Sequence, residues 1–234
     1  MCIRDSVDTF LTVLSVCHTV LPDFPSCMKE HVHTLDSDDA RLACRAAVEY
    51  QAASPDEKAL AIAAKNQAYY FFHREPAQIK LPSAPSLTVN GETVLVNILG
   101  EVVAFSVLES FEFSSERARM SVVVLDPRDG QIKVLTKGSD TKMYKLLSDE
   151  SRSQSWTHTE ESLKEFAQFG LRTLLCGYKI ISEADYVKWQ AEYARAKASI
   201  DKREESVAYW QNEIEQGLTL LGSTSDTTQS AEND

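Results

Sequence analysis

The chain has 234 residues, of which 43% are hydrophobic and 25% charged, and its formal net charge is −11 from 24 basic and 35 acidic residues. These values are ordinary for a globular protein, and the length is enough to bury the core of one large domain or two small ones. The acidic excess argues against nucleic acid as a partner, because binding to phosphates needs clustered Lys and Arg. It also argues against docking on anionic lipid through a basic patch.

The cysteines and histidines show no metal-binding or redox pattern. The 5 cysteines are scattered and no C-x-x-C pair occurs, so we expect reduced thiols in a cytosolic compartment. His31 and His33 fit a chance surface pair better than a metal site. No apolar run reaches the roughly 18 residues that span a bilayer, so we expect no direct membrane insertion.

The N-terminal third is predicted to contain two helices. Apolar residues at helical spacing predict a buried helix over 10–21, followed by a polar loop to residue 39. A second helix is predicted over 55–66. Ser54 is its expected N-cap and Glu57 falls where a capping box requires a carboxylate.

The next segment is expected to be a loop and then strands. The proline-rich stretch 74–86 predicts a surface loop, after an extended segment begins at 69–72. Asn90-Gly91 predicts a two-residue hairpin turn between short strands at 87–89 and 92–96. Alternating apolar residues predict a half-exposed strand over 102–113.

A central hairpin is the most informative feature. The β-branched runs 122–125 and 132–135 are joined by a polar link that contains Pro127 and Gly130, which predicts a hairpin. This hairpin would bring the segment around Phe113 back beside Lys137. An aromatic ring, several hydroxyls and a lysine would then converge, and such groups suit a purine ring and its phosphates.

Helices and strands alternate in the C-terminal part. The expected elements are a short helix over 141–147, a polar linker over 148–159, an amphipathic helix over 160–170, a strand over 172–181, one long helix after Ser182 with an apolar face from Tyr186 to Ile214, and a last strand from 219. We expect disorder over 225–234, where no apolar pattern occurs. The whole pattern predicts an α+β fold, an antiparallel β-sheet flanked by helices.

Several short phrases occur in a fixed order along the chain. They are VCHTV at 16–20, YQAASPDE at 50–57, FSSERARMS at 113–121, KGSD at 137–140, GLRTL at 170–174 and LLGST at 220–224. In this order they resemble the cytosolic nucleotide-binding domain of type IV P-type ATPases, the phospholipid flippases, with more specificity than a single motif. The resemblance implies that domain's fold over 10–224. Residues 1–6 do not continue the family pattern, and we expect a non-native or disordered leader over 1–9.

The resemblance implies that Phe113 and Lys137 bind ATP. The Phe113 ring could stack on adenine for about 1–3 kcal/mol, although the residue pattern alone favours a core strand residue. Lys137 could be a strand-end lysine, and the resemblance makes it the pocket lysine. Gly138 lacks a side chain, which would permit close approach of the backbone to a ligand.

The other implied contacts are weaker from the residues themselves. A capping box explains Glu57 completely, but in the resembling family this glutamate also contacts adenine, and both can hold. Arg172 could reach phosphate oxygens in a fork, and Ser115 supplies a hydroxyl beside Phe113. The family commonly has Lys where this chain has Ala118, so one basic contact would be missing.

Neither a Walker phosphate loop nor G-x-G-x-x-G is present, so ATP would bind without a glycine cradle at a helix N-terminus. The Asp-Lys-Thr-Gly-Thr segment that carries the phosphorylated Asp of the family is also missing from this chain. Without that nucleophile the chain should not turn over ATP by itself.

The expected function is that of the ATP-binding domain of a phospholipid-translocating P-type ATPase. It would act at the cytoplasmic face of a membrane and present ATP to a separate phosphorylation domain. The phosphorylation and actuator domains of the pump would be its partners, and Mg²⁺ would act with the full-length pump. The alternative is a free-standing interaction module of the same fold with little nucleotide affinity, for which Ala118 and the unpatterned tail are the support.

Overall fold

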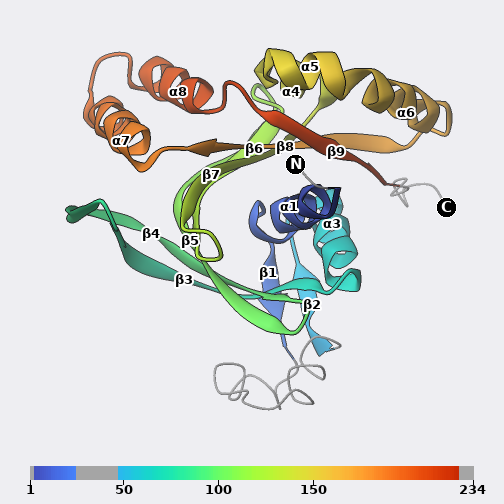
Figure 1. The fold of residues 1–234 in the computed structure, drawn as a ribbon, viewed down its shortest axis with the longest axis horizontal. Coiled ribbons are helices and arrows are strands. Elements are labelled where there is room, and N and C mark those ends of the chain that lie inside the picture. The colour runs from blue at the N-terminus through green and yellow to red at the C-terminus, as the bar shows by residue number, and fades with distance from the viewer. Residues whose placement is uncertain (1–2, 25–46, 227–234) are drawn as a thin grey trace.

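The computed structural model describes residues 3–24 and 47–226. A seven-stranded antiparallel sheet carries the fold, and each strand pairs with the next one along the chain. In Figure 1 the sheet curls strongly, with β3 and β4 at one end and β8 and β9 at the other. The strands are β3 (Tyr69–Leu81), β4 (Ala84–Ile98), β5 (Glu101–Ser114), β6 (Arg119–Asp126), β7 (Gln131–Gly138), β8 (Arg172–Ile181) and β9 (Thr219–Asp226).

Helices cover both faces of this sheet. The helices α1 (Ile3–Val16) and α3 (Pro55–Asn66) lie inside the curve, next to a small sheet of β1 (Leu21–Asp23) and β2 (Glu49–Gln51). The outer helices are α4 (Asp140–Leu146), α5 (Asp149–Gln154), α6 (Trp156–Gln168), α7 (Glu183–Ala198) and α8 (Arg203–Ile214). This arrangement confirms the predicted α+β fold, an antiparallel sheet flanked by helices.

The curled sheet has a separate hydrophobic core on each side. Along β6, Met120, Val122 and Val124 belong to the core under α1 and α3. Val123 points to the other face and packs with aromatic residues of α7. Successive side chains of a strand point to opposite faces, so β6 and β7 are buried on both sides and read as continuous apolar runs. A further cluster lies under α4 and α6.

Several predicted elements are confirmed. The central hairpin forms between β6 and β7, and its strands pair from Arg119↔Gly138 to Asp126↔Gln131. Helix α3 and strand β8 have the predicted bounds. Proline at the first helical position of α3, and the β-branched residues of the hairpin, are strong local signals.

The loop predicted over 74–86 and the turn predicted at Asn90-Gly91 are both wrong. The chain continues as β3 to Leu81, turns, and returns as β4, which runs straight through Gly91. Pro76 is accommodated because β3 is the edge strand of the sheet. Gly91 is needed for close packing: a Cβ there would overlap the carbonyl oxygen of Val107 on β5 and come within 2.9 Å of Ile79 Cδ1.

Other boundaries also differ. The long C-terminal helix is split, because α7 ends at Ala198 and α8 begins after Lys202, whose φ is +48°. Ile200, predicted to lie on a packed face, is fully exposed in the break. The expected polar linker 148–159 forms α5 and the start of α6.

The chain ends also differ from expectation. Residues 3–9, where a non-native or disordered leader is expected, form the first turns of α1, and Asp8 Oδ1 accepts a hydrogen bond from the Tyr69 hydroxyl at 2.5 Å. Strand β9 reaches Asp226, two residues into the expected tail. His31, His33 and 227–234 lie outside the described residues. Within 3–24 and 47–226, no helix is long and apolar enough to cross a bilayer.

Candidate functional site

A cavity of about 410 Å³ opens inside the curve of the sheet. The ends of β5 and β7 and the starts of β6 and β8 meet there, opposite the first turn of α3. Its lining comes from segments far apart in the sequence: Thr19, Ala53, Ser54, Asp56, Glu57, Leu60, Glu112, Phe113, Met120, Lys137, Gly138, Arg172 and Leu174. The structure therefore brings together all the predicted site residues except Ser115.

Strand pairing brings these residues together. Met120 pairs with Lys137 and Lys137 with Cys176, while Ser114, next to Phe113, pairs with Arg119. The predicted proximity of the Phe113 segment and Lys137 is thus confirmed. Met120 and Thr19, which line the cavity, were not among the predicted site residues. Alternation along β6 could have indicated Met120, and the VCHTV phrase contains Thr19.

An ion pair forms the inner part of the site. Lys137 Nζ lies 2.9 Å from Glu57 Oε1, and the lysine side chain is 5% exposed while that of Glu57 is 16% exposed. The other oxygen of Glu57 accepts hydrogen bonds from the Thr19 hydroxyl at 2.7 Å and the Thr19 amide at 3.4 Å. Partial burial would raise the pKa of Glu57, but the charge of Lys137 and these hydrogen bonds hold it below its usual range.

The predicted capping box at α3 does not form. Ser54 is the N-cap as expected, but its side chain makes no capping hydrogen bond. The carboxylate of Glu57 turns instead to Thr19 and Lys137. The Glu57 carboxylate forms an ion pair with Lys137 instead of a capping box, because Lys137 is nearly buried and needs a counter-charge. Glu57 therefore belongs to the cavity.

His18 directly precedes Thr19, the residue that donates hydrogen bonds to Glu57. It is buried, and its pKa is lowered to about 3 by burial and by the positive charges of Lys137 and Arg74. Its neutral ring connects the end of α1 to the residues that follow: Nε2 lies 2.9 Å from the Ser15 carbonyl oxygen, and Nδ1 accepts a hydrogen bond from the Val20 amide at 3.2 Å. These contacts fix the turn that presents Thr19 to Glu57.

Phe113 is an exposed ring at the mouth of the cavity. Its exposed fraction is 60%, so the alternative that it is a core strand residue is wrong. Phe111, two residues earlier, is buried under α7. Residues two apart on a regular strand share a face, but the register of β5 against β6 shifts between Phe111 and Ser114. This irregularity turns Phe113 away from the core and toward the cavity.

Gly138 and Arg172 line the cavity in different ways. A Cβ at Gly138 would lie 2.5 Å from Arg119 Cβ and 2.8 Å from the Ala118 carbonyl oxygen. Close packing against β6 therefore requires this glycine, and the close approach of a ligand that the sequence suggests here stays a prediction. Arg172 lies at the rim with its side chain 67% exposed, and its Nη2 is 2.9 Å from Asp56 Oδ2.

Ser115 and Ala118 lie in the turn between β5 and β6. Ser115 is exposed and does not line the cavity. Ala118 has φ +48°, and its carbonyl accepts a hydrogen bond from the Ser139 amide at 2.9 Å. The backbone that carries the side chain of residue 118 is therefore fixed between the start of β6 and the end of β7.

The arrangement suits a flat, polar-edged ligand. The Phe113 ring offers a stacking surface, and the Glu57–Lys137 pair offers both an acceptor and a donor within the same cavity. Arg172 places a guanidinium at the opening, where a charged part of the ligand could leave the cavity. Within the described ranges, no group of three or more His, Cys, Asp or Glu could hold a metal ion.

Comparison with known proteins gives consistent matches. The family model for "P-type ATPase, cytoplasmic domain N" matches residues 82–226. Phospholipid-transporting ATPase DRS2 of Saccharomyces cerevisiae is 35% identical over 218 residues, which are 93% of this chain and 14% of that protein. Phospholipid-transporting ATPase tat-1 of Caenorhabditis elegans is 31% identical over 94% of this chain and 16% of its own length. Phospholipid-transporting ATPase IK of Mus musculus is 34% identical over 94% of this chain and 14% of its own length.

Proposed function

Since the chain belongs to the P-type ATPases and corresponds to their cytoplasmic domain N, we propose that it binds ATP in the cavity between Phe113 and Lys137. The matches confirm the expected family, the phospholipid-transporting P-type ATPases. The chain spans 14% to 16% of the length of the relatives compared above, so the activity of a whole pump is part of the proposal.

The observation that carries the proposal is the exposed ring of Phe113 in one cavity with the nearly buried Glu57–Lys137 pair. An exposed aromatic ring can stack on a base. The buried charged groups beside it can form hydrogen bonds with the polar edge of a purine. Adenine would occupy the cavity, and the phosphates would leave past Arg172 at the rim. Ser115 is exposed and does not line the cavity, so the proposed site does not include it.

In the parent pump, ATP bound here would be presented to a separate phosphorylation domain, and its hydrolysis would drive phospholipid translocation. We place this domain at the cytoplasmic face of the membrane, with the phosphorylation and actuator domains as its partners. Mg²⁺ would come with the phosphates of ATP, because the residues lining the cavity do not form a dedicated metal site.

Replacing Phe113 by alanine is expected to weaken ATP binding about ten-fold, since stacking contributes about 1–3 kcal/mol and 1.4 kcal/mol is a factor of ten. The melting temperature should hardly change, because the ring is largely exposed. Isothermal titration with ATP and a thermal melt of each protein test this. Tyr209→Ala on α8 is the matched control, since Tyr209 is 57% exposed and does not line the cavity.

Unchanged ATP affinity in Phe113→Ala would remove this residue from the site. If the unmodified chain binds no ATP, the alternative of an interaction module with little nucleotide affinity replaces the proposal. Restoring a lysine, Ala118→Lys, in the same titration shows whether the absent basic side chain explains weak binding.

ADP and ATP are expected to bind within a few-fold of each other, and the isolated chain should release no phosphate. The cavity would hold the base, while Arg172 is the basic side chain at its rim that the phosphates would meet. Competitive titration and a phosphate-release assay measure both. A preference for ATP of about 100-fold, which is about 2.7 kcal/mol, would show that further groups hold the phosphates. Sustained phosphate release would show that the chain can activate phosphoryl transfer without the missing Asp.

A further inference from the structure

Glu215 is a buried carboxylate on the face of the sheet opposite the cavity. It follows α8 and is 0% exposed. It accepts hydrogen bonds from Arg119 Nε at 2.8 Å, Arg119 Nη2 at 2.6 Å and the Ser121 hydroxyl at 2.5 Å. The guanidinium of Arg117 also pairs with it. Its acceptor positions are thus filled from the turn between β5 and β6 and from β6.

Arg117 connects this carboxylate to the strand that carries Phe113. Its Nη1 donates to the carbonyl oxygen of Glu112 at 3.2 Å, and its guanidinium lies over the Phe111 ring, 5.6 Å from the centroid. The Glu112 carbonyl belongs to the peptide bond that leads into Phe113. Because β5 is irregular at this point, the strand ladder alone does not hold Phe113, and Arg117 supplies a contact from the side.

Arg119 connects the same carboxylate to the other wall of the cavity. Its Cβ is the atom that a side chain at Gly138 would strike, and the two residues pair across β6 and β7. Ser121, which also donates to Glu215, lies 3.0 Å from the Thr136 hydroxyl on β7. Glu215 therefore reaches both strands that end at the cavity, although it does not line the cavity.

We propose that Glu215 is a positioning residue for the nucleotide cavity, which holds Phe113 through Arg117 and Gly138 through Arg119. This inference rests on the proposed function for its effect on ATP, but its effect on the cavity walls is independent of any ligand. A buried ion pair is weak evidence for a stabilising role, because desolvation offsets the attraction. Instead, hydrogen bonds from two guanidinium groups to one carboxylate fix the orientation of the Arg117 and Arg119 side chains.

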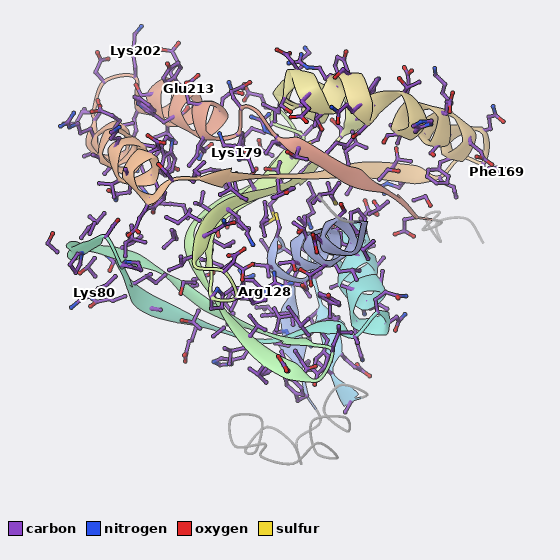
Figure 2. The ribbon with its side chains drawn as sticks, viewed as in Figure 1. Lys80, Arg128, Phe169, Lys179, Lys202 and Glu213 are labelled. Atoms are coloured by element: carbon purple, nitrogen blue, oxygen red, sulfur yellow. The ribbon has the colours of Figure 1, made fainter. Side chains whose placement is uncertain are left out.

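The same hairpin provides a matched control at its other end. Asp126 is also a buried carboxylate between two cations, with Arg128 Nη2 at 2.7 Å and Lys133 Nζ at 2.8 Å. Figure 2 shows Arg128 at the turn of the hairpin beside α1, while Glu213, two residues before Glu215, lies on the opposite side of the sheet. Asp126→Asn therefore removes a comparable carboxylate charge without touching the cavity.

The test compares Glu215→Gln with Asp126→Asn in the same chain. Glu215→Gln is expected to weaken ATP binding about ten-fold, which is about 1.4 kcal/mol, because Phe113 and Gly138 are held less firmly. It should also shift the amide NMR signals of Phe113 and Gly138 without nucleotide. Asp126→Asn should lower the melting temperature but leave the ATP affinity and those signals unchanged. If Glu215→Gln does not fold, Arg117→Lys carries the test, because lysine cannot bridge Glu215 and the Glu112 carbonyl.

Equal ATP affinities and unchanged cavity signals in Glu215→Gln, or in Arg117→Lys where that variant carries the test, would overturn the inference. An equal loss of affinity in Asp126→Asn would also overturn it, since the effect would then be one of general stability. If the unmodified chain binds no ATP, the proposed function fails by itself. The amide signals then decide the positioning role: shifts limited to the Glu215 and Arg117 variants support it, and shared shifts refute it.

Discussion

Lys137→Met is expected to destabilise the folded chain by about 3 kcal/mol, near the low end for breaking a buried ion pair. The variant leaves Glu57 in the cavity without its cation, although the carboxylate keeps 16% exposure and its hydrogen bonds to Thr19. Because the lysine side chain is only 5% exposed, its loss affects the stability of the fold as well as the cavity.

A double-mutant cycle with Glu57→Gln separates the parts of this effect. Urea unfolding of the double variant should show a smaller loss than the sum of the single losses, because no unpaired charge remains. If the loss of the double variant equals the sum of the two single losses, Glu57 and Lys137 are not energetically coupled. Since the pKa of Glu57 is lowered in the folded state, its contribution is present above the ordinary carboxyl range and is lost as the pH falls through the lowered pKa.

Binding should respond to Lys137 separately from stability. ATP affinity measured on the folded Lys137→Met chain is expected to fall about ten-fold, through loss of a charge-assisted contact of about 1.5–3 kcal/mol. Asp126→Asn again serves as the control, because it disrupts an ion pair of the same strand pair at the far end. A loss of stability in Lys137→Met without any loss of ATP affinity would make this lysine structural.

Gly91→Ala is expected to destabilise the chain by about 3 kcal/mol, at the upper end for overpacking. The added methyl would overlap the carbonyl oxygen of Val107, a backbone atom in the middle of the sheet that cannot move alone. Relief would require β4 and β5 to separate. Thermal and urea unfolding measure the change, and ATP affinity in the folded state should remain, because Gly91 does not line the cavity.

Gly130→Ala distinguishes this clash from the loss of glycine itself. Gly130 lies in the turn of the central hairpin at φ +70°, and a Cβ there would meet nothing within 4 Å. It should cost about 1 kcal/mol, from the left-handed backbone alone. If Gly91→Ala costs no more than Gly130→Ala, the close approach of β5 to Gly91 is not rigid.

Local signals in the sequence were sufficient for the elements nearest the site. Pro55 and the β-branched hairpin strands predicted α3, β6 and β7, and hence the meeting of Phe113 with Lys137. They were insufficient where neighbours decide. Pro76 indicated a loop because proline is tolerated on an edge strand, and the order of strands that makes β3 an edge strand cannot be read from the segment itself. Gly91 indicated a turn because the sequence does not distinguish a glycine in a turn from a strand glycine that is required by a nearby carbonyl oxygen of the next strand.

The sequence by itself determined the α+β class, the family and most of the candidate site, since those depend on periodicity and on ordered phrases that are local in the chain. Only the tertiary structure decided what the side chains do. Glu57 leaves its helix cap for Lys137 because burial of the lysine demands a counter-charge. Phe113 is exposed while Phe111 is buried because an irregular pairing with β6 rotates one residue out of the core. Burial and pairing partners arise from contacts between distant segments, and the periodicity of a single segment does not contain them.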